Sequence, residues 1–153
     1  MCYDGMSECE KGLTMIRSIL FAAALSISAA AAPATAQSVE DASAIEGVIM
    51  SQVEAMGADN WELAFTFASP TIQGIFRDPY NFSQMVQRGY PMVWKPRQVT
   101  AGALTNTPQG LVQTMLFEDQ QGRIYIADYQ MQMIEGVWRI NGVMIRPAEQ
   151  GNA

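Results

Sequence analysis

The chain has 153 residues, of which 49% are apolar and 16% are charged, and its formal net charge is −6. This length and apolar content predict one domain with a packed core, which excludes general disorder. The chain contains no histidine, which excludes serine–histidine and cysteine–histidine catalysis and metal sites built on histidine. The acidic balance gives no electrostatic footprint for nucleic acid as a partner.

The N-terminal part carries the pattern of an export signal. An almost wholly apolar stretch runs over residues 16–32, and Ala34-Thr35-Ala36 follows it as an A-x-A cleavage site. We predict a signal peptide over residues 15–36, cleavage before Gln37, and a periplasmic or secreted protein with no stable membrane span after cleavage. An uncleaved anchor helix is the alternative interpretation.

Residues 1–14 do not fit the start of a signal peptide, because acidic residues outnumber Lys11 there. We interpret them as a doubtful extension from a start codon read too early, with Met15 as the true start. A genuine cytoplasmic extension is the alternative. Both cysteines, Cys2 and Cys9, lie in this segment, so the exported chain would hold no cysteine.

The predicted domain, residues 38–147, begins with helical patterns. Ser38 is the expected N-cap of a helix over residues 39–56, where apolar residues recur at helical spacing. A second helix follows a cap at Asp59 or Asn60. We expect its buried face to carry the residues at i, i+3, i+4 and i+7: Trp61, Ala64, Phe65 and Ala68.

Two shorter helices are predicted next. Ser69-Pro70 is typical of a helix start, because serine is a good N-cap and proline suits the first helical position. The side chains expected on the buried side of this helix are Ile72, Ile75 and Phe76. Asn81 is the expected cap of a fourth helix, which ends near Gly89.

From residue 92 the pattern changes to an alternation of period two, which predicts strands. They are expected near 99–103, over 111–117, over 123–134 and over 137–145, and Asn141-Gly142 predicts a bulge or a bend in the last one. Helices followed by strands predict an α+β fold, with N-terminal helices packed on a curved, mostly antiparallel four-stranded sheet in a cone-like arrangement. Residues 148–153 are predicted to be a flexible tail.

Three segments resemble the bacterial family called domain of unknown function 4864: residues 61–70 (WELAFTFASP), residues 90–91 (YP) and residues 136–143 (GVWRINGV). That family resembles the nuclear transport factor 2-like superfamily, which implies an α+β cone with a pocket between helices and sheet. The resemblance implies no activity. Some enzymes of the superfamily use a histidine–aspartate pair, which this chain lacks because it has no histidine. Isomerase-like members use aspartates and a tyrosine, and no motif in this chain aligns with those residues.

Asp128 is the candidate acid–base residue, because it lies in mid-strand on a face shared with Ile126. If that face lines the cone, desolvation would raise the pKa of the carboxyl group and make it a base. Gln130 on the same face favours the alternative of a solvent-exposed face. Tyr125 and Tyr129 lie on the opposite face and are the candidate hydroxyl donors, or else simply core residues.

The candidate ligand-binding residues are Trp94, Tyr129, Trp138, Arg139 and Asn141. Their aromatic rings could stack on a ligand, and Arg139 and Asn141 could orient it from one side of the last strand. The alternatives are aromatic rings that close the core and an arginine in a surface ion pair. The methionines are expected in the core rather than in a copper(I) site, so no metal and no cofactor is predicted.

Three functions remain open at this point. The favoured one is a non-catalytic exported domain that binds a small apolar or amphipathic ligand or a protein partner. The first alternative is a histidine-free acid–base isomerase or lyase that uses Asp128 and a tyrosine. The second is a structural envelope protein that forms a homodimer through its open sheet face.

Overall fold

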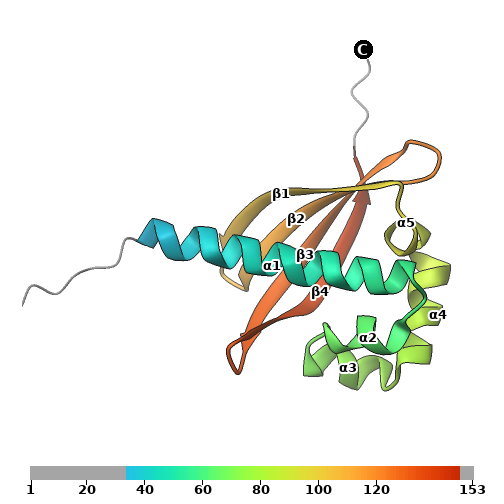
Figure 1. The fold of residues 1–153 in the computed structure, drawn as a ribbon, viewed down its shortest axis with the longest axis horizontal. Coiled ribbons are helices and arrows are strands. Elements are labelled where there is room, and N and C mark those ends of the chain that lie inside the picture. The colour runs from blue at the N-terminus through green and yellow to red at the C-terminus, as the bar shows by residue number, and fades with distance from the viewer. Residues whose placement is uncertain (1–33, 149–153) are drawn as a thin grey trace, which may run out of the picture. The chain divides into compact units, whose positions relative to one another are not determined.

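The computed structural model describes residues 34–148, with helices first and strands after them (Figure 1). The helices are α1 (Ala34–Gly57), α2 (Trp61–Thr66), α3 (Pro70–Phe76), α4 (Pro79–Gly89) and α5 (Pro91–Trp94). The strands are β1 (Gln98–Thr107), β2 (Gly110–Glu118), β3 (Ile124–Ile134) and β4 (Val137–Pro147), and they form one antiparallel sheet in chain order. The predicted α+β fold is confirmed.

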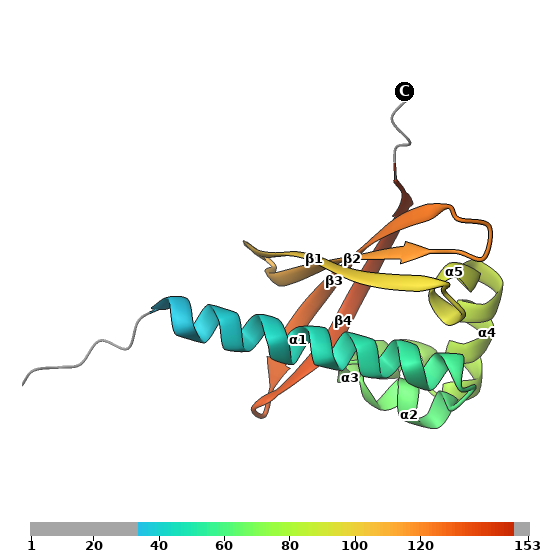
Figure 2. The same ribbon diagram turned by 45° about the horizontal axis from the view of Figure 1, so that its top comes forward.

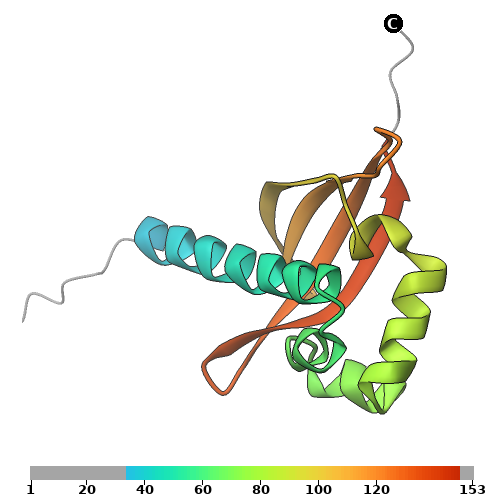
Figure 3. The same cartoon turned by 45° about the vertical axis from the view of Figure 1, so that its right-hand side comes forward.

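The helices gather on one face of the sheet. Helix α1 crosses that face (Figure 1), and α2 to α5 wrap around the C-terminal end of α1 (Figure 3). In the described part of the chain, no helix covers the other face (Figure 2). The predicted extension, the signal peptide up to residue 33 and the tail from residue 149 lie outside the described residues.

Helix α1 supplies one side of the core. Its buried side chains recur at helical spacing, from Ile45 through Ile49 and Val53 to Met56. The predicted N-cap at Ser38 is wrong, because the helix already begins at Ala34 and Ser38 lies inside it. The residues before Ser38 include two alanines, and alanine has the highest helix propensity, which is consistent with the earlier start.

The predicted starts of α2 and α3 are confirmed. The side chain of Asn60 accepts a hydrogen bond from the Leu63 amide at 3.2 Å, and the Ser69 hydroxyl accepts one from the Ile72 amide at 3.3 Å. Ile75 is exposed rather than buried. Ile72 and Phe76, four residues apart, define the covered face of α3, and Ile75 lies outside it.

Two predictions about the following segment are wrong. The cap of α4 is Asp78, whose Oδ1 accepts a hydrogen bond from the Asn81 amide at 2.8 Å. Because Pro79 occupies the first helical turn, the capping position falls on the residue before it. Residues 91–94 form the short helix α5 instead of the start of a strand, since Pro91 begins another helical turn there.

The two faces of the sheet differ in burial. Along β3, Ala127, Tyr129 and Met131 are buried against the helices, and the residues between them point to the other face. The predicted bulge is confirmed, because Gln130 pairs with Gly142 and Met131 with Ile140, which leaves Asn141 as the extra residue.

The end of α2 is held by side chains from three other elements. The Gln52 amide Nε2 of α1 donates to the Ala64 carbonyl at 3.1 Å, and the Gln73 amide Nε2 of α3 donates to the Phe65 and Ala68 carbonyls at 3.2 and 3.0 Å. The Arg139 guanidinium of β4 donates to the Thr66 carbonyl at 2.6 Å. These bonds satisfy the carbonyl groups that a helix end leaves without partners.

The chain after α2 also joins the edge of the sheet. The Ile140 amide donates to the Phe67 carbonyl at 2.9 Å, and the Ser69 amide donates to the Ile140 carbonyl at 2.8 Å. Ala68 thereby forms a parallel bridge with Ile140. The Ser69 hydroxyl, which is fully buried, donates to Asn141 Oδ1 at 2.8 Å. This junction fixes the helices relative to β4.

The variant Ser69→Ala tests this junction. It removes the N-cap of α3 and leaves Asn141 Oδ1 without its donor, so the free energy of unfolding should fall by about 2 kcal/mol. Urea unfolding followed by circular dichroism measures the change. The control is Ser51→Ala, an exposed serine on α1, which should leave stability within about 0.5 kcal/mol of the wild type.

Candidate functional site

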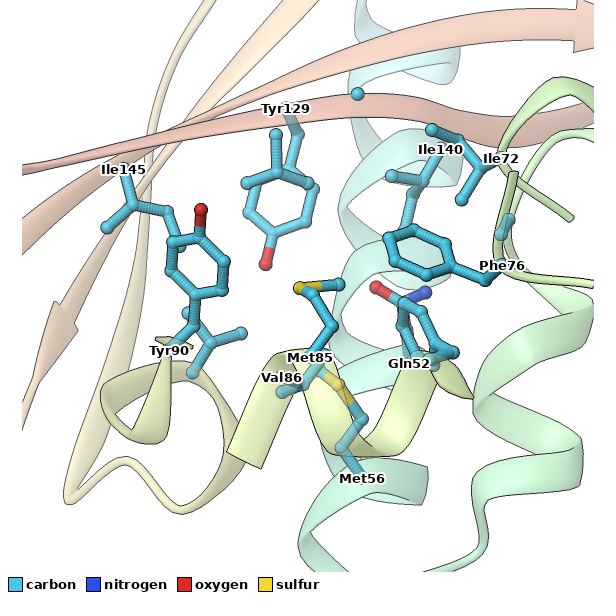
Figure 4. A pocket seen from close by; sticks show the side chains of 15 residues that line it. Gln52, Met56, Ile72, Phe76, Met85, Val86, Tyr90, Tyr129, Ile140 and Ile145 are labelled. Atoms are coloured by element: carbon cyan, nitrogen blue, oxygen red, sulfur yellow. The ribbon is translucent and has the colours of Figure 1, made fainter. Parts of the chain in front are cut away.

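A cavity of about 370 Å³ lies between the helices and the inner face of the sheet (Figure 4). It is lined from α1, the α2–α3 junction, α3, α4, α5, β3 and β4 by Gln52, Met56, Ala68, Ile72, Phe76, Phe82, Met85, Val86, Tyr90, Val93, Tyr129, Ile140, Gly142, Val143 and Ile145. All of these are uncharged. The cavity has the volume and the apolar lining that small-molecule sites usually have.

The walls of the cavity follow from the amphipathic pattern of the elements around it. On α4, the residues Phe82, Met85 and Val86 are spaced i, i+3 and i+4, so they share the face that turns toward the sheet. On β4, the bulge at Asn141 shifts the alternation, so that both Ile140 and Val143 line the cavity.

Gln52 is the polar group that α1 brings to the cavity, and its side chain is 4% exposed. Its Nε2 must face the Ala64 carbonyl, because a carbonyl oxygen accepts and only the amide nitrogen can donate. The Oε1 atom therefore points away from α2, and Figure 4 shows the amide group at the cavity wall. Within the described residues, no side-chain hydrogen bond reaches Oε1.

Tyr129 is the polar group that β3 brings to the cavity, and it is 1% exposed. Its ring lies at 6.3 Å from the Phe117 ring in the core, and its hydroxyl group points into the cavity (Figure 4). Among the described residues the hydroxyl has no hydrogen-bond partner, and burial raises the pKa of the Tyr129 phenol above its usual value. The hydroxyl oxygen is accessible from the cavity rather than sealed in the core, so water or a bound molecule can serve as its partner.

The cavity opens beside Tyr90 and Val143, which line it and are exposed, in contrast to the buried Gln52 and Tyr129. Gln52 and Tyr129 therefore lie deep in the cavity. The mouth is formed by the apolar Val143 side chain and by the Tyr90 ring with its hydroxyl group (Figure 4).

The structure places Asp128 outside the cavity. Its carboxylate lies on the sheet face opposite the helices, where Oδ1 accepts from the Thr114 hydroxyl at 2.8 Å and Oδ2 lies 3.2 Å from the Arg146 guanidinium. Tyr125 shares the inner face with Tyr129 but borders a different hollow, where the Arg123 guanidinium lies 5.9 Å from its ring centre. Asp128 and Tyr129 do not meet.

Of the predicted ligand-binding residues, Tyr129 alone lines the cavity. Trp94 donates from Nε1 to Asp59 Oδ1 at 3.0 Å and lies under the Lys95 ammonium group. Trp138 and Asn141 border a separate hollow beside the β1–β2 turn, and Arg139 holds the Thr66 carbonyl. Trp94 and Arg139 therefore make contacts within the fold, and Trp138 and Asn141 lie at a different hollow of the surface.

Several cavity residues were not singled out in the sequence. Gln52 had a visible signal, because it is a polar residue within the apolar stripe of the first helix. Met85, Tyr90 and Val143 gave no such signal, because their positions around one cavity depend on how the helical layer is placed over β4, which no local pattern encodes.

Within residues 34–148, no group of three or more histidine, cysteine, aspartate or glutamate side chains is placed to hold a metal ion. No helix in the described segment is long and apolar enough to cross a membrane.

The buried phenol predicts a dependence of stability on alkaline pH. Because the pKa of Tyr129 is raised on folding, the folded chain keeps the phenol proton where the unfolded chain loses it. The contribution of the protonated Tyr129 phenol to the free energy of unfolding is fully present below about pH 10 and falls as the pH rises further. Tyr129→Phe should therefore flatten the alkaline loss of stability, measured by urea unfolding between about pH 9 and 11.

The control for this measurement is Tyr125→Phe, which leaves Tyr129 in place two residues along the same face. It should keep the wild-type slope. Equal slopes for the wild type and Tyr129→Phe would contradict the burial of an un-ionised phenol.

No curated protein and no solved structure matches the chain. A family model does match over residues 38–153, which includes all four strands and nearly the whole of the described helical layer. The likeness of that family to the nuclear transport factor 2-like superfamily stays a prediction. The chain belongs to the family described as Domain of unknown function (DUF4864).

Proposed function

We propose that this domain binds a small apolar or amphipathic ligand in the cavity between helices and sheet, without catalysis. The observation that carries the proposal is an apolar cavity of about 370 Å³ with Tyr129 and Gln52 turned into it. Protein interiors are close-packed, so a cavity of this size leaves its lining atoms without contacts that a ligand would supply. The transfer of an apolar ligand from water to an apolar wall is also favourable.

The acid–base alternative has less support. An isomerase or lyase of the expected type needs a carboxylate beside the bound molecule, and none lines the cavity in the described part of the chain. Asp128 is paired with Arg146 on the other sheet face. The structural alternative predicts a cavity that stays without a ligand, so a binding experiment separates it from the proposal.

The methionines provide the probe for that experiment. Met56 and Met85 line the cavity, whereas Met144 lies on the opposite sheet face and is 69% exposed. On titration with 1-decanol, the ¹³C-methyl NMR signals of Met56 and Met85 should shift and that of Met144 should not. Shifts spread over all methionines, or none at all, would contradict the proposed site.

Two neighbouring substitutions on β4 test the site by blocking it. Val143→Trp places a large ring at the mouth of the cavity and should weaken decanol binding about tenfold or more. Met144→Trp adds the same ring one residue along, on the other face of the sheet, and should bind like the wild type. Equal affinities of the two variants would place the ligand elsewhere.

We also propose that the domain is exported, as the A-x-A pattern at Ala34–Ala36 indicates. The family match begins at residue 38, the second residue after the proposed cleavage site, which supports this. N-terminal sequencing of protein from the cell envelope should begin at Gln37. Cytosolic protein that begins at Met1 or Met15 would overturn the proposal.

A further inference from the structure

We infer that the ligand is an uncharged amphiphile with one hydroxyl head group, bound with its head at the deep end of the cavity and its apolar tail toward the mouth. This inference rests on the proposed function and specifies the chemical class that the same cavity takes. It follows from the charge of the lining, from the two unpartnered polar atoms and from the position of the mouth.

The first step concerns charge. The lining residues contain no lysine, arginine, aspartate or glutamate, so the cavity offers no counter-ion to a bound molecule. An ion that leaves water for an apolar site without a counter-ion loses far more solvation than the site returns. A carboxylate or a quaternary ammonium group is therefore disfavoured in the deep part of the cavity.

The second step concerns hydrogen bonding. The Tyr129 hydroxyl can donate into the cavity, and the Gln52 Oε1 atom can only accept, since the Ala64 carbonyl fixes the orientation of the amide. Both side chains are more than nine-tenths buried. A ligand hydroxyl can accept from the Tyr129 hydroxyl or donate to Gln52 Oε1, whereas a ketone or an ether can only accept. An alcohol can therefore pair with either of the two atoms.

The third step concerns direction and size. Gln52 and Tyr129 are buried and bring two polar groups to the deep end, whereas the exposed residues Tyr90 and Val143 bring one, the Tyr90 hydroxyl, so the deep end takes the head. At roughly 30 Å³ per water-sized group, the cavity of about 370 Å³ holds about a dozen non-hydrogen atoms. A primary alcohol of about ten carbons fits this space, and a longer chain would reach the mouth.

The test compares three probes of equal chain length at neutral pH: 1-decanol, decanoate and decyltrimethylammonium, each below the concentration at which it forms micelles. Binding is followed by the Met56 and Met85 methyl signals and by calorimetry. We expect decanol to bind at least about tenfold more tightly than either ion. Equal or tighter binding of an ion would overturn the inference and leave the proposed function standing. Binding of none of the three would overturn the proposed function, and the inference with it.

A matched pair of variants tests the head-group contact. Tyr129→Phe removes one hydroxyl group from the cavity and keeps the ring, and should weaken decanol binding about fivefold to tenfold. Tyr125→Phe makes the same change on the same strand face outside the cavity and should leave the affinity unchanged. If the two variants bind decanol equally, the head does not contact Tyr129 and the proposed orientation is wrong. Gln52 is left intact in these tests, because its Nε2 also holds α2.

Discussion

The backbone carbonyl groups of residues 64–68 need hydrogen-bond donors, and the structure depends on how those donors are supplied. The last carbonyl groups of any helix lack donors within that helix, so most donors for the C-terminal carbonyls of the six-residue α2 come from other elements. They come from Gln52, Gln73, Arg139 and the Ile140 backbone, which belong to α1, α3 and β4. One short segment thereby positions two other helices and the edge strand, and these elements carry much of the cavity wall.

This constraint gives a physical meaning to two of the segments that resemble the family. Residues 61–70 contain the carbonyls that need partners, and residues 136–143 contain the arginine, the amide and the bulge that meet them. The contact at Ser69 and Asn141 then closes the junction with a buried side-chain hydrogen bond. The two segments are far apart in the chain and form one structural unit.

Local chemistry explains which parts of the fold could be predicted from the sequence. Ser69 before a proline, the alternation of β3 and the bulge at Asn141 each depend on neighbouring residues, and each was predicted. The start of α1 and the cap of α4 were missed where two local signals competed, as at Asp78 and Asn81. The cavity could not be predicted, because its wall combines residues of α4 and β4 that lie far apart in the chain, and residue type alone drew attention to Trp94, Trp138 and Asp128 instead.

The double role of Gln52 has a consequence for how this scaffold can diversify. One end of its amide holds α2 and the other faces the cavity, so a substitution at Gln52 that alters the deep end also weakens the fold. The walls at Ile72, Met85 and Val143 are not buried and make no such bond among the described residues. Under the proposed function, substitutions at these walls would change the length and width of the ligand at little cost to stability, whereas a change at Gln52 would alter the recognition of the head group and the stability of the fold together.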